Sequence, residues 1–102
     1  MRPPRLTALA LEDWLSAHPT WRLVDGHLIC DWRAPSHREA AQLVLDQVPI
    51  ADRLDHHAVV TLTYRDLRVE LWTHDRDGLT ALDLAYADAF DELLGQRRDP
   101  IN

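Results

Sequence analysis

The sequence predicts a single α+β domain of order α-β-β-α-β-β-α, whose four-stranded antiparallel sheet carries helices on one face. Two stretches of alternating apolar and polar residues flank short turns, which is typical of β-hairpins. Segments with apolar residues at helical spacing precede, separate and follow these hairpins. The 102 residues, 46% of them hydrophobic, suffice for one core. We therefore expect one domain over residues 1–102, packed at about 7–95, with short tails.

The first helix and hairpin follow a lead-in, residues 1–6, that we expect to be unstructured. Thr7 is a suitable N-cap for a helix that continues to about His18. Strands at 21–24 and 27–32 flank Asp25-Gly26, a dipeptide that tolerates the positive φ angles of a tight hairpin turn. The apolar stripe of the helix consists of Leu9, Leu11, Trp14 and Leu15.

A second helix is predicted by the capping-box pattern of Ser36 and Glu39. Pro49 lies within this helix and should kink or interrupt it before it ends at about Leu54. Its inner face is expected to contain Ala40, Leu43, Val44 and Val48.

The second hairpin is predicted at residues 59–64 and 67–73, joined by a turn at Arg65-Asp66. In its second strand, Leu67, Val69 and Leu71 face one side and Arg68, Glu70 and Trp72 the other. Thr80 and Asp83 then cap a last helix that Gly95 should end. The buried face of that helix is expected to be Leu82, Ala85, Tyr86, Ala89, Phe90 and Leu93.

Charge and cysteine content exclude several classes of protein. The net charge of −6, without any basic run, argues against a direct nucleic-acid partner. The longest apolar run, residues 8–11, is too short to span a bilayer, and no secretory signal is evident. Cys30 is the only cysteine, which leaves no intramolecular disulfide and fits a reducing compartment. We expect a cytoplasmic protein with neither nucleic acid nor membrane as a partner.

The residues best suited to chemistry gather around the second hairpin. His56 and His57 precede its first strand, beside Asp52 and Asp55, and His74 follows its second strand. Because an antiparallel hairpin returns to its starting end, we expect the three histidines to converge in space.

A metal site and acid–base catalysis are the two competing interpretations of this cluster. Three histidines can form an open zinc site. However, adjacent histidines in a strand point to opposite faces, and the chain has neither an H-E-x-x-H pattern nor a C-x-x-C pair. Imidazole is well suited to proton transfer at neutral pH. The residues therefore favour metal-free acid–base chemistry.

The same residues form part of a longer pattern, which comprises Asp52, His56, His57, Tyr64, Thr73, His74, Gly78, Leu79, Thr80 and Asp83. The residues and their intervals resemble the pterin-4a-carbinolamine dehydratase family, and the resemblance covers about residues 7–95 with the same order of helices and strands. The chain departs from the family at Ala58, where the family usually has proline, and at Val60, where it has a larger residue.

This resemblance implies a lyase that dehydrates a 4a-hydroxytetrahydropterin, such as 4a-hydroxytetrahydrobiopterin, to the quinonoid dihydropterin in tetrahydropterin recycling. Such a reaction needs proton transfers but no metal or organic cofactor. By resemblance, His57 and His74 transfer protons and His56 binds or assists. The substrate-binding residues would be Asp52, Asp55, Asp83, Trp21 and Thr73. Asp52 and Asp83 would orient imidazoles or bind the pterin, and Trp21 would stack on its ring or be an ordinary core residue.

The alternative is a non-catalytic interaction module of the transcriptional coactivator type, because relatives in this family act as dimerisation partners of a transcription factor. The three histidines and their neighbouring aspartates favour the enzyme. We also expect a homodimer or homotetramer, since the sheet leaves one face and an edge strand open.

Overall fold

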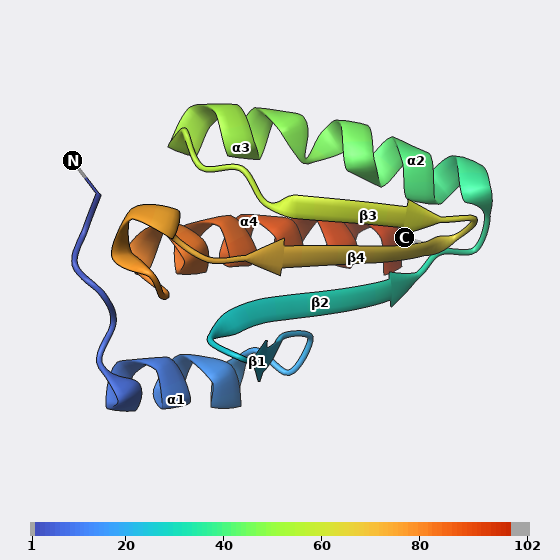
Figure 1. Cartoon of the computed structure of the whole chain (residues 1–102). Helices are drawn as coiled ribbons and strands as arrows, with labels where there is room; N and C mark the ends of the chain where they lie inside the picture. The colour runs from blue at the N-terminus through green and yellow to red at the C-terminus, as the bar shows by residue number, and fades with distance from the viewer. Residues whose placement is uncertain (1, 99–102) are drawn as a thin grey trace.

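The predicted order of helices and strands is confirmed by a computed structural model that describes residues 2–98 (Figure 1). The helices are α1 (Ala8–Ala17), α2 (His37–Asp46), α3 (Val48–Leu54) and α4 (Ala81–Arg98), with a short 3-10 helix η1 (His74–Arg76). The strands are β1 (Arg22–Val24), β2 (His27–Arg33), β3 (Val59–Thr63) and β4 (Asp66–Leu71). In the described part of the chain, no helix is both long and apolar enough to cross a membrane.

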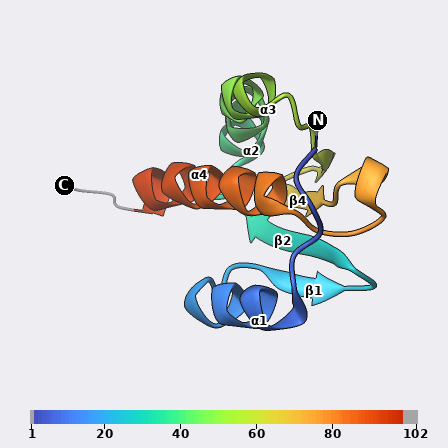
Figure 2. The same cartoon turned by 90° about the vertical axis from the view of Figure 1, so that its left-hand side faces the viewer.

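The four strands form one antiparallel sheet of order β1-β2-β4-β3, with the helices on one face (Figure 2). The alternation predicted for β4 is confirmed, because Leu67, Val69 and Leu71 are buried in the core beneath the helices. The opposite face carries charged pairs. There, hydrogen bonds from Arg68 lower the pKa of the Asp31 carboxyl, which remains partly exposed.

Local capping explains where the helices begin. The Thr7 and Ser36 hydroxyls accept hydrogen bonds from backbone N–H groups three residues further on, at 3.1 and 3.2 Å, and so begin α1 and α2. The predicted interruption at Pro49 is also confirmed. Pro49 lies in the first turn of α3, where its missing N–H needs no partner.

Several local predictions are wrong. The second hairpin turns at Tyr64-Arg65 rather than Arg65-Asp66, because Thr63 pairs with Asp66 and Tyr64 takes a φ of 56°. Helix α4 continues through the exposed Gly95 to Arg98, because one glycine within a helix costs only about 1 kcal/mol relative to alanine. The predicted burial of the helix faces is wrong at several side chains: Leu9, Val48 and Ala85 are exposed, whereas Ala87 and Leu94 are buried.

The N-terminal arm is ordered by long-range contacts, contrary to the predicted lead-in. The amide of Leu6 donates to the carbonyl of Leu79 at 2.8 Å, and Arg5 forms a β-bridge with Thr80. The guanidinium of Arg76 donates to the carbonyls of Arg2 and Pro3, at 2.8 and 3.1 Å. The arm therefore lies against the segment between β4 and α4.

Candidate active site

The predicted convergence of His56, His57 and His74 is confirmed. All three line one pocket of about 400 Å³ at the end of the β3–β4 hairpin. The register explains it, because Val59 at the start of β3 lies opposite Glu70 near the end of β4. The other lining residues are Arg2, Asp55, Val59, Trp72, Thr73 and Asp75.

The end of α3 sends the two adjacent histidines into different surroundings. Asp55 takes a left-handed conformation, with φ 49°, and ends the helix. The next amide, that of His56, donates to the carbonyl of Ala51 at 3.0 Å and turns the chain back toward the core. His56 is consequently buried, whereas His57 is exposed.

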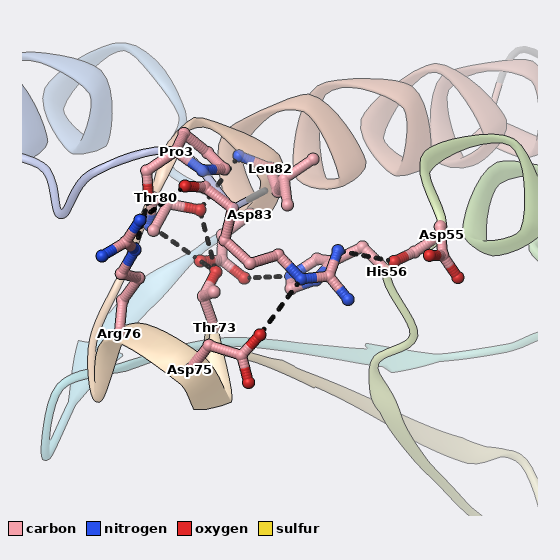
Figure 3. A network of polar contacts seen from close by, with 10 residues as sticks. Pro3, Asp55, His56, Thr73, Asp75, Arg76, Thr80, Leu82 and Asp83 are labelled. Atoms are coloured by element: carbon pink, nitrogen blue, oxygen red, sulfur yellow. Dashed lines mark hydrogen bonds and ion pairs between the residues drawn. The ribbon is translucent and has the colours of Figure 1, made fainter.

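His56 is held by a buried carboxylate on α4. Its Nε2 lies 2.6 Å from Oδ1 of Asp83, a side chain that is 0% exposed. The other oxygen of Asp83 accepts from the Thr73 hydroxyl at 2.8 Å and from the Thr80 amide at 2.9 Å. Figure 3 shows Asp83 between these partners. Asp83, predicted as part of the cap of α4, therefore also orients a histidine of the pocket.

This arrangement assigns the proton on the neutral His56 ring. The Asp83 carboxylate is an acceptor, so the His56 Nε2 carries the hydrogen. The Nδ1 of His56 then has a free lone pair, and no residue of the described chain forms a hydrogen bond with it. His56 therefore lines the pocket with a ring that Asp83 orients and whose Nδ1 keeps its lone pair.

His57 has a comparable partner in a very different setting. Its Nε2 lies 3.1 Å from Oδ1 of Asp52, and the two side chains are 61% and 67% exposed. Solvent competes for both groups, so this pair restrains the ring only weakly. His57 is therefore an exposed and weakly restrained imidazole at the pocket rim.

His74 begins η1, directly after Thr73 at the end of β4. Its ring is exposed, but its Nδ1 accepts a hydrogen bond from the indole Nε1 of Trp72 at 3.0 Å. The backbone around it is closed by a hydrogen bond of 2.8 Å from the Thr73 amide to the carbonyl of Gly78. The hydrogen bond from Trp72 and the closed backbone around His74 thus both restrict the position of its ring.

Some of the other residues predicted for the site lie at the pocket, and some lie elsewhere in the structure. Asp55 and Thr73 line the pocket, Asp83 lies beneath it, and Asp52 contacts it only through His57. Trp21 lies elsewhere, as an ordinary core residue. Its indole donates to Asp91 at 2.9 Å and its ring packs edge-on against Phe90. Neither departure from the family pattern, Ala58 or Val60, is among the lining residues, and both pack against the core.

Sequence reasoning missed Arg2 and Trp72 as pocket residues. The Arg2 guanidinium donates to the carbonyl of Asp55 at 2.8 Å and lies 3.5 Å from the carboxylate of Asp75, so it joins two edges of the pocket. No local pattern could reveal this, because Arg2 reaches the pocket only through the N-terminal arm. Trp72 carried a usable signal, since it directly precedes Thr73-His74.

The pocket combines imidazole, carboxylate, hydroxyl and indole side chains. Within residues 2–98, no group of three or more histidine, cysteine or acidic side chains is arranged to hold a metal ion. Each of the three histidines has one ring nitrogen in a hydrogen bond, with Asp83, Asp52 and Trp72 as the respective partners.

The fold and this pocket define a class of small α+β proteins in which imidazoles from two junctions of a β-hairpin meet a buried carboxylate. Residues 4–93 match the model of the pterin 4 alpha carbinolamine dehydratase family, and the chain belongs to that family.

Relatives and a solved structure agree with this assignment. A protein from Metallosphaera sedula, provisionally named pterin-4-alpha-carbinolamine dehydratase, is 33% identical over 88% of this chain and 94% of its own length. A protein of the same provisional name from Picosynechococcus sp. is 35% identical over 87% of this chain and 97% of its own. The crystal structure of a transcriptional coactivator/pterin dehydratase from Brucella melitensis superimposes with a TM-score of 0.83 at 26% identity, covering 87% of this chain and 97% of the other.

Proposed function

We propose that this protein dehydrates a 4a-hydroxytetrahydropterin, such as 4a-hydroxytetrahydrobiopterin, to the quinonoid dihydropterin. The reaction breaks the C4a–O bond, removes the proton from N5 and forms a C4a=N5 double bond, and the hydroxyl leaves as water after it gains a proton. The observation that carries the proposal is the pocket in which His56, held by Asp83, faces two further imidazoles.

Each histidine has a proposed role that follows from its surroundings. His56 takes the N5 proton at Nδ1, because its Nε2 is already bound to Asp83. His57 delivers the proton that completes the water, since its exposed ring exchanges protons readily with solvent. His74 donates a hydrogen bond to the departing hydroxyl. The family resemblance alone favoured His57 and His74 as the proton-transfer pair, and the firm orientation of His56 is the reason to revise it.

The experiment is absorbance-monitored dehydration of a 4a-hydroxytetrahydropterin that is generated in situ, with the uncatalysed rate subtracted. We expect the wild type to accelerate the reaction, and treatment with EDTA to leave the rate unchanged. His37→Gln is the matched control, because His37 is an exposed histidine on α2 outside the pocket, with its ring near Tyr64. This control should keep the wild-type rate, whereas His56→Gln should not.

The competing function is an interaction module, as the name of the Brucella melitensis protein includes coactivator activity. A wild type that is well folded but no faster than the uncatalysed reaction would contradict the dehydratase proposal and favour this module. Loss of activity after EDTA, restored by a stoichiometric metal, would contradict the metal-free mechanism.

We also propose a homodimer or homotetramer. Strand β3 is at the edge of the sheet, its residue Val59 is exposed, and none of the helices within residues 2–98 covers the opposite face of the sheet (Figure 2). Unpaired edges and open faces of this kind favour association. Sedimentation at micromolar concentration should show an assembly, and a monomer at every concentration would contradict the expectation.

A further inference from the structure

Trp72 lies between two imidazoles at the end of the sheet. Its ring stacks on that of His27, with centroids 4.1 Å apart and planes 4° apart. The ring of His74 meets its edge, with centroids 5.4 Å apart and planes 83° apart. Of these rings, those of Trp72 and His74 line the pocket, and His27 lies behind Trp72.

The hydrogen bond between Trp72 and His74 can have only one direction. An indole Nε1 is a donor and never an acceptor. The Nδ1 of His74, 3.0 Å away, must therefore be the unprotonated nitrogen. The neutral ring of His74 then carries its hydrogen on Nε2, and this N–H is the group that remains for a ligand.

Trp72 is itself held by residues of two neighbouring strands. His27 begins β2, and its Nδ1 lies 2.5 Å from Oε2 of Glu70 on β4. Strands β2 and β4 are paired up to Leu28 and Leu71, next to His27 and Trp72. A carboxylate and a stacked imidazole on a paired scaffold thus restrict the orientations that the indole can adopt.

We propose that Trp72, supported by His27 and Glu70, is a positioning residue that holds His74 as the Nε2–H tautomer. The pocket then presents two imidazoles of opposite character, with a lone pair on Nδ1 of His56 and a donor on Nε2 of His74. A neutral imidazole of this kind can polarise a substrate oxygen by donating a hydrogen bond. The tautomer assignment stands on geometry alone, and its catalytic consequence rests on the proposed function.

Nitrogen-15 NMR tests the tautomer without any substrate. In the wild type at a pH where His74 is neutral, we expect an unprotonated Nδ1 and a protonated Nε2 for His74. We also expect a coupling through the hydrogen bond between Nε1 of Trp72 and Nδ1 of His74. In Trp72→Phe, the two ring nitrogens of His74 should move toward averaged shifts. A protonated Nδ1, or the absence of the coupling in the wild type, would overturn the proposal.

Steady-state kinetics then test whether the orientation of His74 by Trp72 matters for catalysis. Trp72→Phe should lower kcat about 10–100-fold with little change in KM, similar to the loss of a group that orients a metal-bound imidazole. His27→Ala should weaken the coupling and lower kcat less, because the indole keeps its own hydrogen bond.

Trp14→Phe is the matched control, because Trp14 also stacks on a histidine, His18, at 4.0 Å, but lies outside the pocket. It should leave both the His74 shifts and kcat unchanged, and its melting temperature shows what the loss of such a stack does to the fold. If Trp72→Phe does not fold, the wild-type coupling still decides the tautomer, and His27→Ala tests the kinetics.

The outcomes separate this proposal from the proposed function. A wild-type coupling in a protein without dehydratase activity would support the tautomer assignment and contradict the proposed function. An active wild type whose kcat is unaffected by Trp72→Phe would overturn the positioning role while leaving the proposed function in place.

Discussion

Two histidines that are adjacent in the chain, His56 and His57, each contact an aspartate through Nε2, yet the two pairs differ in almost every physical respect. The pair of His56 with Asp83 is 6% and 0% exposed and joins the segment after α3 to α4 at 2.6 Å. The pair of His57 with Asp52 is 61% and 67% exposed and spans five residues at 3.1 Å. Identical side chains are therefore buried and firmly held in one setting, and exposed and weakly restrained in the other.

The two histidine–aspartate pairs suit two different steps of the proposed reaction. A buried carboxylate that accepts three hydrogen bonds fixes the ring of His56 and the direction of its free nitrogen. An exposed pair adds little free energy and allows the ring of His57 to exchange protons with water. We expect a general base to benefit from the first setting and a proton carrier from the second.

Removal of the buried carboxylate should have the largest effect. Asp83→Ala leaves His56, Thr73 and the Thr80 amide without their acceptor. We expect the free energy of unfolding to fall by about 3–5 kcal/mol, as for other broken buried pairs. Urea denaturation measures it, and Asp52→Ala, its exposed counterpart, should lose less than about 1 kcal/mol. Equal losses for the two variants would show that burial does not distinguish the pairs.

Substitution of the two histidines should separate them kinetically. His56→Gln keeps an N–H donor for Asp83 but removes the basic nitrogen, so kcat should fall by roughly 10²–10⁴. His57→Ala should lose only about tenfold, because water can replace an exposed proton carrier. Steady-state dehydration rates provide the measurement. A larger loss for His57→Ala than for His56→Gln would reverse the proposed roles.

Chemical rescue sharpens the same comparison. Added imidazole can reach the rim position of His57 from solvent, whereas it can reach the position of His56, 6% exposed, only through the pocket that the substrate occupies. Millimolar imidazole should therefore restore much of the rate of His57→Ala and none of that of His56→Ala. Rescue of both variants to the same extent would mean that the cavity left by His56 is open to solvent.

A third pair, Asp31 with Arg68, lies on the charged face of the sheet. Its removal should have the smallest effect on stability. Hydrogen bonds from Arg68 lower the pKa of Asp31, so this pair stabilises the fold above about pH 4, the pKa of an aspartate in the unfolded chain. Its contribution is lost as the pH falls through the lower, folded-state pKa. Asp31→Asn should be slightly less stable than wild type at pH 7, and the difference should vanish in acid. A difference that persists in acid would indicate a contribution other than charge.

Local sequence patterns were sufficient to predict the helix caps and the convergence of the three histidines. Thr7, Ser36 and Thr80 begin helices because their hydroxyls accept nearby backbone amides, which depends on neighbours in sequence. Local patterns failed at Tyr64 and Gly95. At Tyr64 the pairing of β3 with β4 set the turn, and at Gly95 the low helix propensity of a single residue was too small a cost to end α4.

By itself, the sequence determined the order of elements, the α+β class, the hairpin geometry that brings His56 and His57 to His74, and the family pattern. All of these depend on periodicity, turn residues and spacing along the chain. Only the tertiary structure decided that Asp83 holds His56, that Trp21 belongs to the core, and that Arg2 and Trp72 line the pocket. The reason is physical: which partner a polar side chain finds, and how much water surrounds it, depends on residues that are distant in sequence and are brought together by folding.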